Sequence, residues 1–255
     1  MECISKWRNY SEVRVRFGPW ILALCAIHVY AADPTAILDS HVRCILGGVK
    51  EGAWIPTGPV STTGSFRAVY AGGVSIPVSV GGVESAGEAC EGTRSATLTP
   101  VPPGNLPFVV FSGKWNPQPR PVEDLSKHKG RYARAFQRFL ADQGLREQAE
   151  VGQTLRADLD GDGQPEIIAV LRHPGSYTAI LVRRQSQGRV STLIASLEKD
   201  GEDLSEQRIA MLADLNGDGR MEIIVHGEYK QGIFTAVYAL DRESIRKVMS
   251  CACGG

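Results

Sequence analysis

The sequence predicts a mainly β protein made of a small N-terminal all-β domain, one amphipathic helix and two four-stranded antiparallel meanders. Three observations predict it: short apolar runs bounded by Gly or Pro fill residues 41–113, apolar residues at helical spacing occur at 132–140, and the last third of the chain repeats itself. With 43% hydrophobic and 22% charged residues, the composition is ordinary for a folded globular chain. We expect domains over 32–115 and 150–255, with a linker and helix over 116–149.

Residues 1–31 are expected to be a signal peptide. Four Lys or Arg residues precede the apolar run PWILALCAIHVYAA, which is shorter than the about 20 residues that a membrane-spanning helix needs. Cleavage near Ala31 would give a mature chain with no membrane span, exported to the periplasm or the outside of the cell. A buried N-terminal helix and lipid attachment at Cys25 are the alternatives.

Short strands and turns are predicted throughout the N-terminal domain. The runs are HVRCILGG, AWIP, FRAVYAGG, VSIPVSVGG, SATLTPV and FVVFSG, and Gly or Pro punctuates each of them. Glycine pairs at 47, 72 and 81 suit tight hairpins or bulges. Helical periodicity is absent from this part of the sequence, so we expect an all-β domain.

Four cysteines remain after the expected cleavage: Cys44, Cys90, Cys251 and Cys253. Disulfides are expected in an exported chain, and four cysteines allow three pairings. We expect Cys44 to pair with Cys90, because both lie in the N-terminal domain. The C-x-C pair in the tail CACGG has three interpretations: structural cysteines, an easily reduced redox disulfide, or a soft-metal pair for copper.

The segment NPQPRPVED, residues 116–124, is rich in proline and is expected to be a linker. A helix should follow it and end near Gly144. Its apolar stripe consists of Tyr132, Ala135, Phe136, Phe139 and Leu140. The basic residues beside this stripe are interpreted as a solvated helix face. Because 28 basic residues balance 28 acidic ones, the chain has no net positive charge that would attract nucleic acid.

The C-terminal third contains two copies of one unit. ADLDGDGQPEII at 157–168 matches ADLNGDGRMEII at 213–224 in nine of twelve positions, and YTAILVRR matches FTAVYALD further on. Each unit reads as strand, acidic loop, strand, turn, strand, turn, strand, which predicts a meander. Runs such as EIIAVL are apolar on both faces, so each sheet should be covered on both sides.

The acidic loops have the oxygen spacing of a calcium site. Ca²⁺ takes six to eight oxygen ligands, and alternate residues of a curled loop can aim carboxylates inward. The expected ligands of the first site are Asp158, Asp160, Asp162, the Gln164 carbonyl and Glu166. Those of the second site are Asp214, Asn216, Asp218, the Arg220 carbonyl and Glu222. Asn216 is neutral, so we expect the second site to bind Ca²⁺ more weakly. The alternative is that these Asp-Gly clusters only make turns.

An EF-hand is excluded, because the twelfth loop position holds Ala169 in the first copy and Val225 in the second. A loop that closes at position nine and enters an apolar strand resembles the FG-GAP or VCBS repeat of integrin α type, over roughly 150–250. The resemblance implies propeller-blade-like meanders, Ca²⁺ between the first two strands, and a role outside the cytoplasm. The whole arrangement is also similar to small secreted bacterial proteins that carry this repeat. The sequence shows two such units, whereas full propellers use four to eight blades.

The sequence contains no recognisable set of catalytic residues. It contains neither H-E-x-x-H nor G-x-S-x-G, and its histidines after residue 31 are scattered, with His226 interpreted as a core or edge residue. We expect a secreted, non-catalytic calcium-binding module for a protein or glycan ligand at the cell surface. The alternatives are a periplasmic thiol oxidoreductase using Cys251 and Cys253, and a hydrolase of envelope polymers.

Overall fold

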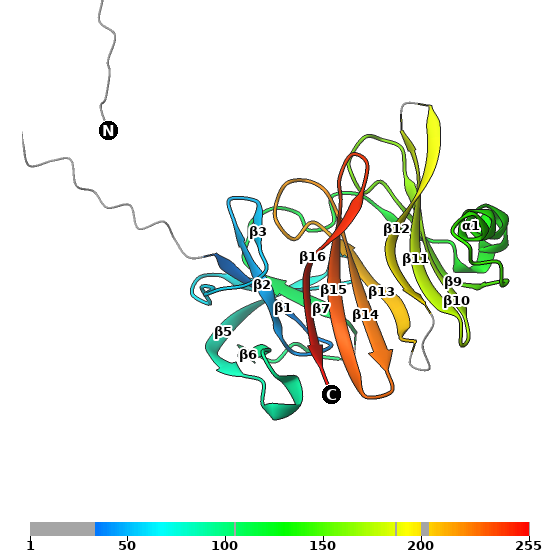
Figure 1. Cartoon of the computed structure of the whole chain (residues 1–255). Coiled ribbons are helices and arrows are strands. Elements are labelled where there is room, and N and C mark those ends of the chain that lie inside the picture. The colour runs from blue at the N-terminus through cyan, green and yellow to red at the C-terminus, as the bar shows by residue number, and fades with distance from the viewer. Residues whose placement is uncertain (1–33, 105, 187, 200–203, 255) are drawn as a thin grey trace, which may run out of the picture. The chain divides into compact units, whose positions relative to one another are not determined.

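Three antiparallel sheets and one helix form four successive layers in the computed structural model (Figure 1). The structure describes residues 34–104, 106–186, 188–199 and 204–254. The expected signal peptide lies outside the described residues. Residues Asp33–Gly255 form one compact unit.

The first layer is a seven-stranded sheet in the order β3-β2-β1-β7-β4-β5-β6. Its strands are β1 Thr35–Asp39, β2 Ile45–Lys50, β3 Ala53–Ile55, β4 Phe66–Tyr70, β5 Ser75–Ser85, β6 Arg94–Thr99 and β7 Phe108–Phe111. The short helix η1, Glu88–Cys90, joins β5 to β6. Strand β1 lies in the expected N-terminal domain but precedes the first predicted strand run, and it pairs with β2 and β7 near the middle of the sheet.

The two repeats each form the predicted antiparallel meander. The first has the order β12-β11-β10-β9, and β8 is added at its edge; the second has the order β13-β14-β15-β16. The bounds of the first sheet are β8 Val122–Asp124, β9 Glu150–Ala157, β10 Glu166–His173, β11 Tyr177–Ser186 and β12 Arg189–Lys199. Those of the second are β13 Glu206–Ala213, β14 Glu222–Tyr229, β15 Gly232–Leu240 and β16 Ile245–Cys253.

Both meanders are covered on both faces, as their continuous apolar strands predict. Consecutive strand residues point to opposite faces, so Ile167 and Ile168 enter different cores. Ile168 packs with Ile223 between the two meanders. Ile224, the next residue, packs with Ile37 between the second meander and the N-terminal sheet. The three sheets are therefore held together by continuous apolar packing.

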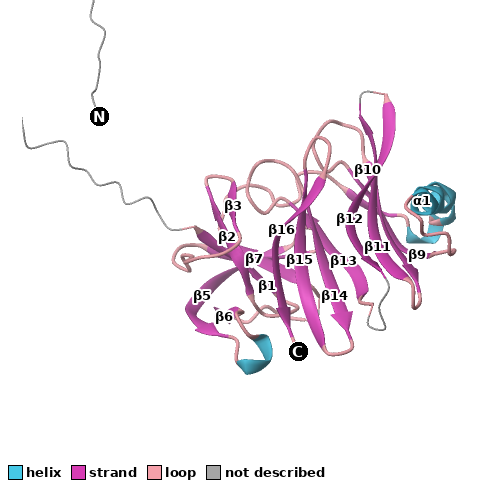
Figure 2. Ribbon diagram, in the orientation of Figure 1, coloured by secondary structure: helices cyan, strands magenta, loops and turns pink. Residues whose placement is uncertain are grey.

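The single α-helix, α1 Gly130–Asp142, covers the outer face of the first meander (Figure 2). Its buried residues Phe136 and Leu140 belong to the predicted apolar stripe. Gly144 has φ +85°, and the Leu145 N–H donates to the Leu140 carbonyl at 2.9 Å, which ends the helix at the predicted place. The short helix η2, Ser126–His128, precedes α1. No helix in the described part of the chain is long and apolar enough to cross a membrane.

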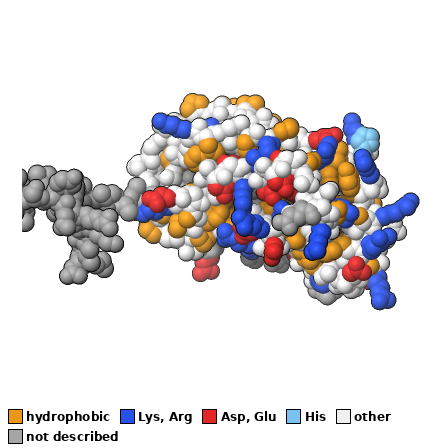
Figure 3. Space-filling model, turned by 90° about the horizontal axis from the view of Figure 1, so that it is seen from above, with side chains coloured by type: hydrophobic (Ala, Val, Ile, Leu, Met, Phe, Trp, Pro, Cys, Tyr) orange, Lys and Arg blue, Asp and Glu red, His pale blue; other side chains and the backbone are white. Residues whose placement is uncertain are grey.

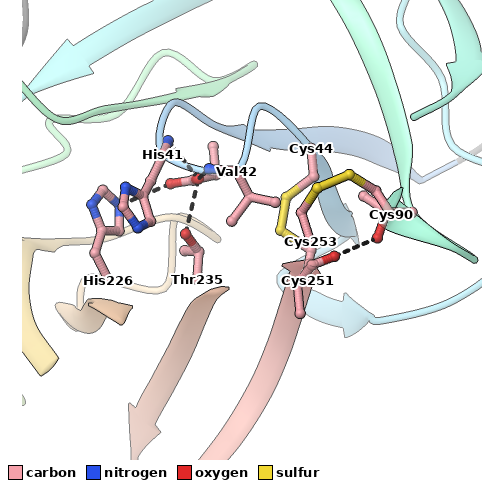
Figure 4. Close-up of a disulfide and its surroundings, with 11 residues drawn as sticks. His41, Val42, Cys44, Cys90, His226, Thr235, Cys251 and Cys253 are labelled. Atoms are coloured by element: carbon pink, nitrogen blue, oxygen red, sulfur yellow. Dashed lines mark hydrogen bonds and ion pairs between the residues drawn. A yellow bond between two sulfur atoms is a disulfide. The ribbon is translucent and has the colours of Figure 1, made fainter. Parts of the chain in front are cut away.

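Two disulfides join the C-terminal strand β16 to the N-terminal sheet. Cys44 is bonded to Cys251 and Cys90 to Cys253, with Cα–Cα distances of 6.6 and 4.2 Å (Figure 4). The expected Cys44–Cys90 pairing is wrong, because it assumed that neighbours in the sequence pair, whereas β16 lies against β2 and η1. Since both tail cysteines are bonded, the C-x-C pair serves a structural purpose and offers no thiolate to a soft metal.

Candidate metal centre

The two acidic loops, 158–165 and 214–221, lie side by side at the upper ends of the meanders in Figure 1. A backbone hydrogen bond of 2.8 Å joins them, from the Met221 N–H to the Leu159 carbonyl. Seen from above in Figure 3, acidic and basic side chains lie together near the middle of this end. The duplicated loops therefore form one composite surface.

Each loop is curled by the same hydrogen bonds. Asp158 accepts bonds from the backbone N–H groups three and five residues further on, at 2.8 and 3.1 Å. Asp214 accepts the equivalent bonds at 2.6 and 2.9 Å. Gly161 has φ +80°, a left-handed conformation that favours glycine. The repeated sequence thus gives a repeated backbone conformation.

A buried glutamate closes each loop. The Glu166 Oε2 accepts a hydrogen bond of 2.8 Å from the Leu159 N–H, and the Glu222 Oε2 accepts one of 2.9 Å from the Leu215 N–H. Burial is the main reason that the pKa of Glu166 is raised to about 7, and nearby Asp160 adds to the effect. Burial raises the pKa of Glu222 as well.

The Glu166 Oε1 is buried and has no hydrogen-bond partner in the described part of the chain. Carboxylate oxygens of Asp158, Asp160 and Glu166 all lie within 4.8 Å of one another. Such spacing suits a hard cation with oxygen ligands at about 2.3 to 2.6 Å. A cation there would also partner the unpaired oxygen, so these three residues fit a calcium site.

The other expected ligands stand outside this group of three carboxylates. The Asp162 Oδ1 accepts a hydrogen bond of 2.7 Å from the Gln164 N–H. In the second loop Asn216 occupies the position of Asp160 and donates to the Gly52 carbonyl at 3.0 Å. Among the described residues, the first loop alone brings three acidic, histidine or cysteine side chains this close.

Two arginines that the sequence interpretation missed lie against the first loop. Arg184 is buried and donates to the Asp160 Oδ2 at 2.8 Å. Arg120 lies 3.8 Å from the Asp158 carboxylate and donates to the carbonyl of Gly219 in the second loop at 2.7 Å. The positive charges offset part of the repulsion among the carboxylates. The alignment of the two repeats contained a signal for Arg184: the aligned residue in the second copy is acidic, so the charge at this position differs between the copies.

Trp115, at the end of the expected N-terminal domain, and the start of the expected linker after it cover both loops. The Trp115 Nε1 donates to the Asp214 carbonyl at 2.9 Å, and the Asp214 N–H donates to the Pro117 carbonyl at 2.8 Å. The Trp115 ring also lies so close to Gly217 that an added Cβ would approach it to 3.0 Å. Residues 115–120 therefore form one wall of the acidic loops.

Comparison with known families supports the resemblance over the two loops. Residues 158–225 match the family model of an FG-GAP-like repeat, from the first aspartate of the first loop to the strand after the second. No curated protein and no solved structure matches the chain.

Proposed function

We propose that this chain is an exported, non-catalytic β-repeat binding protein whose two acidic loops hold Ca²⁺ as structural ions. The observation that carries the proposal is the buried, unpaired Glu166 Oε1 beside the carboxylates of Asp158 and Asp160. The FG-GAP-like repeat supports the binding role.

The donor set favours Ca²⁺ over a transition metal. Carboxylates and carbonyls are the ligands that Ca²⁺ prefers, whereas zinc and copper sites use His or Cys. The cluster contains neither. Curled loops that already order their oxygens through backbone hydrogen bonds need little rearrangement to receive an ion. The second site uses Asp214, Asn216, Asp218, the Arg220 carbonyl and Glu222 in the same backbone conformation.

The proposed ligand of the protein is a protein or glycan at the cell surface. Two disulfides support an oxidising compartment. The thiol oxidoreductase alternative is not favoured by the structure, because Cys251 and Cys253 are each bonded to the N-terminal sheet and not to one another. Nothing among the described residues favours the hydrolase alternative.

The test is calorimetric titration of the full chain with CaCl₂, together with thermal melts in calcium and in chelator. For a dissociation constant of about 10⁻⁵ to 10⁻⁴ M and about 1 mM free calcium, mass action stabilises the fold by roughly 1.4 to 2.7 kcal/mol per site. Chelation should therefore lower the melting temperature. Absence of binding heat, with superimposable melts, would refute calcium binding.

Matched variants locate the sites. Glu166→Gln keeps an acceptor for the Leu159 N–H but removes the charge, so it should abolish binding at the first loop, and Glu222→Gln should do the same at the second. Glu206→Gln, in an exposed position on β13, is the control and should leave both sites intact. Arg184→Gln should strengthen binding at the first loop by removing a competing positive charge. If the double variant of Glu166 and Glu222 bound calcium normally, the assignment of the loops would be wrong.

A further inference from the structure

A cavity of about 490 Å³ opens between the β1–β2 turn, residues 101–104 and 106–107, and strands β13 and β14. None of its lining residues belongs to the acidic loops. Its polar wall contains His41, Arg43, Arg208 and His226, and we call it the histidine cavity. Its volume falls in the range of small-molecule sites, about 300 to 1,000 Å³.

Asp39 organises the floor of the histidine cavity. Its Oδ1 lies 3.0 Å from the His226 Nε2, and its Oδ2 accepts hydrogen bonds from the Thr235 hydroxyl at 2.9 Å and from the backbone N–H groups of His41 and Val42 at 2.7 and 2.9 Å (Figure 4). These contacts occupy both oxygens of the Asp39 carboxylate. The carboxylate fixes the orientation of the His226 ring with Nε2–H as the donor to Asp39.

A disulfide fixes this floor in place. Thr235 pairs in register with Cys251 on the neighbouring strand, and Cys251 is bonded to Cys44 at the end of the turn that carries Asp39 and His41. Figure 4 shows the histidines and the disulfide as neighbours on the same turn and sheet. A disulfide therefore connects the turn that carries Asp39 and His41 to the sheet that carries Thr235.

Two imidazole nitrogens in the cavity have no partner. The His226 Nδ1 and the His41 Nε2 are buried and make no hydrogen bond within the described residues, and the His226 residue is only 2% exposed. Buried polar atoms are nearly always paired in folded proteins, so each nitrogen calls for a ligand group. The two rings are stacked, with centroids 4.4 Å apart and planes 9° from parallel. Stacked rings cannot both direct an in-plane lone pair at one metal ion, which disfavours a metal.

The charges around the cavity favour an anion. Arg43 and Arg208 line it, and neither forms an ion pair with a described residue. Asp39 is the one acidic residue among the described lining residues, and its hydrogen bonds already occupy it. Two arginines and two histidines thus surround a space whose single carboxylate is satisfied. An anion would be attracted to the two guanidinium groups. The His226 ring that donates to Asp39 through Nε2 presents its Nδ1 as an acceptor, so the imidazoles flank the anion without donating to it.

The remaining wall is apolar and open to solvent. Val101 and Leu106 expose 80% and 67% of their surface, and Leu98 and Phe108 lie deeper in the lining. Exposed apolar side chains beside converging polar groups are typical of a site for a small molecule that has both kinds of surface.

We propose that the histidine cavity binds a small organic carboxylate. Its carboxylate group would meet Arg43 and Arg208 beside the two histidines, and its apolar body would cover Val101 and Leu106. A planar carboxylate matches the paired donors of a guanidinium group. The inference goes beyond the proposed function and does not depend on calcium.

The test is calorimetric titration of the full chain with sodium octanoate, acetate, 1-octanol and inorganic phosphate. Octanoate should bind at least about tenfold more tightly than acetate, which lacks the apolar body, and than octanol, which lacks the charge. Octanoate should also shift the imidazole ¹⁵N resonances of His41 and His226. Absence of octanoate binding would overturn the proposal, and phosphate binding as tight as octanoate would overturn the assignment of the apolar wall.

Variants separate the two ends of the ligand. Arg208→Gln should weaken octanoate and acetate alike, by about fivefold or more, whereas Leu106→Ser should weaken octanoate and leave acetate unchanged. Both side chains are exposed, so these variants fold even if His226→Gln does not. Arg246→Gln, on β16 outside the cavity, is the control and should bind octanoate normally. Unchanged octanoate affinity in both Arg208→Gln and Leu106→Ser would refute the site.

Discussion

Removing either disulfide should cost a large part of the stability, because each closes a long segment of chain. Cys44 and Cys251 are 207 residues apart, and Cys90 and Cys253 are 163 apart. In the chain-entropy model, bridges across loops of this length each stabilise by roughly 5 kcal/mol when acting alone. The two bridges do not act alone, because they join the same two parts of the chain.

With the bridge between Cys44 and Cys251 in place, the second bridge closes only the segments 44–90 and 251–253, about 48 residues in all. The same model gives about 4 kcal/mol for that smaller loop. We therefore expect a loss of about 4 kcal/mol for the pair Cys90→Ser and Cys253→Ser, and about the same for Cys44→Ala and Cys251→Ala. Removal of both bridges should cost roughly 9 kcal/mol.

Urea unfolding of the three variants under non-reducing conditions measures these losses. Apart from Cys3 and Cys25 of the expected signal peptide, no thiol should be free in any variant, since the other cysteines are removed in bonded pairs. If removal of Cys44 and Cys251 left Cys90 and Cys253 as free thiols, or if peptide mapping of the unaltered protein joined Cys44 to Cys90, the pairing would be wrong. A loss below about 1 kcal/mol for either pair would refute the loop-entropy reasoning.

Two further predictions concern the first meander. The pKa of Glu166 is raised to about 7, so in chelator this residue stabilises the fold below about pH 4.5, and that contribution is lost as the pH rises through 7. Urea unfolding between pH 5 and 8 should show the decline, and Glu166→Gln should reduce its slope, while the raised pKa of Glu222 maintains part of it; an equal slope in the variant would contradict the assignment. Phe136→Ala should cost about 3 to 5 kcal/mol, because the ring is completely buried between α1 and the first meander. The exposed Arg134→Ala is the control, and equal urea midpoints for the two variants would show that the helix does not hold the core.

Local signals in the sequence were sufficient for the helix and both meanders. The stripe around Phe136 has helical spacing, and Gly144 marks its end. The acidic loops begin and end at the same residues in both copies, so the strands on either side were placed in register. These features depend on neighbouring residues, which is why the sequence alone predicted them.

Features that depend on distant packing were not predictable. Strand β1 has an ordinary short apolar run, and its place near the middle of the sheet comes from pairing with β7, about 70 residues later. Arg120 lies in a proline-rich segment that suggests a linker, yet it bonds to both acidic loops. The cysteine pairing failed for the same reason, because sequence distance says nothing about where β16 lies. In the candidate calcium site, the residue types came from the sequence and the arginines came from the fold.

The order of the layers explains how two repeats are enough for a stable core. Ile167 and Ile223 occupy equivalent positions in the two repeats and face the same way: Ile167 packs toward α1, and Ile223 packs toward the first meander. Likewise Ile168 faces the second meander, and Ile224 faces the N-terminal sheet. The helix thus stands where a preceding repeat would stack, and the N-terminal sheet stands where a following repeat would stack.

Repeat units bury their apolar faces against neighbours, so the ends of a short stack need caps. The two caps are held differently. α1 caps the first meander without a disulfide, through an apolar contact with Phe136 and Leu140 at its centre and hydrogen bonds of Gln137 to the segment before β9. The N-terminal sheet caps the second meander through a core that includes Ile37 and Phe111, and two disulfides also hold it there. Under reducing conditions the contact between the N-terminal sheet and β16 should therefore weaken first, while the contact between α1 and the first meander is unaffected, and hydrogen exchange of β16 against β10 would report the difference.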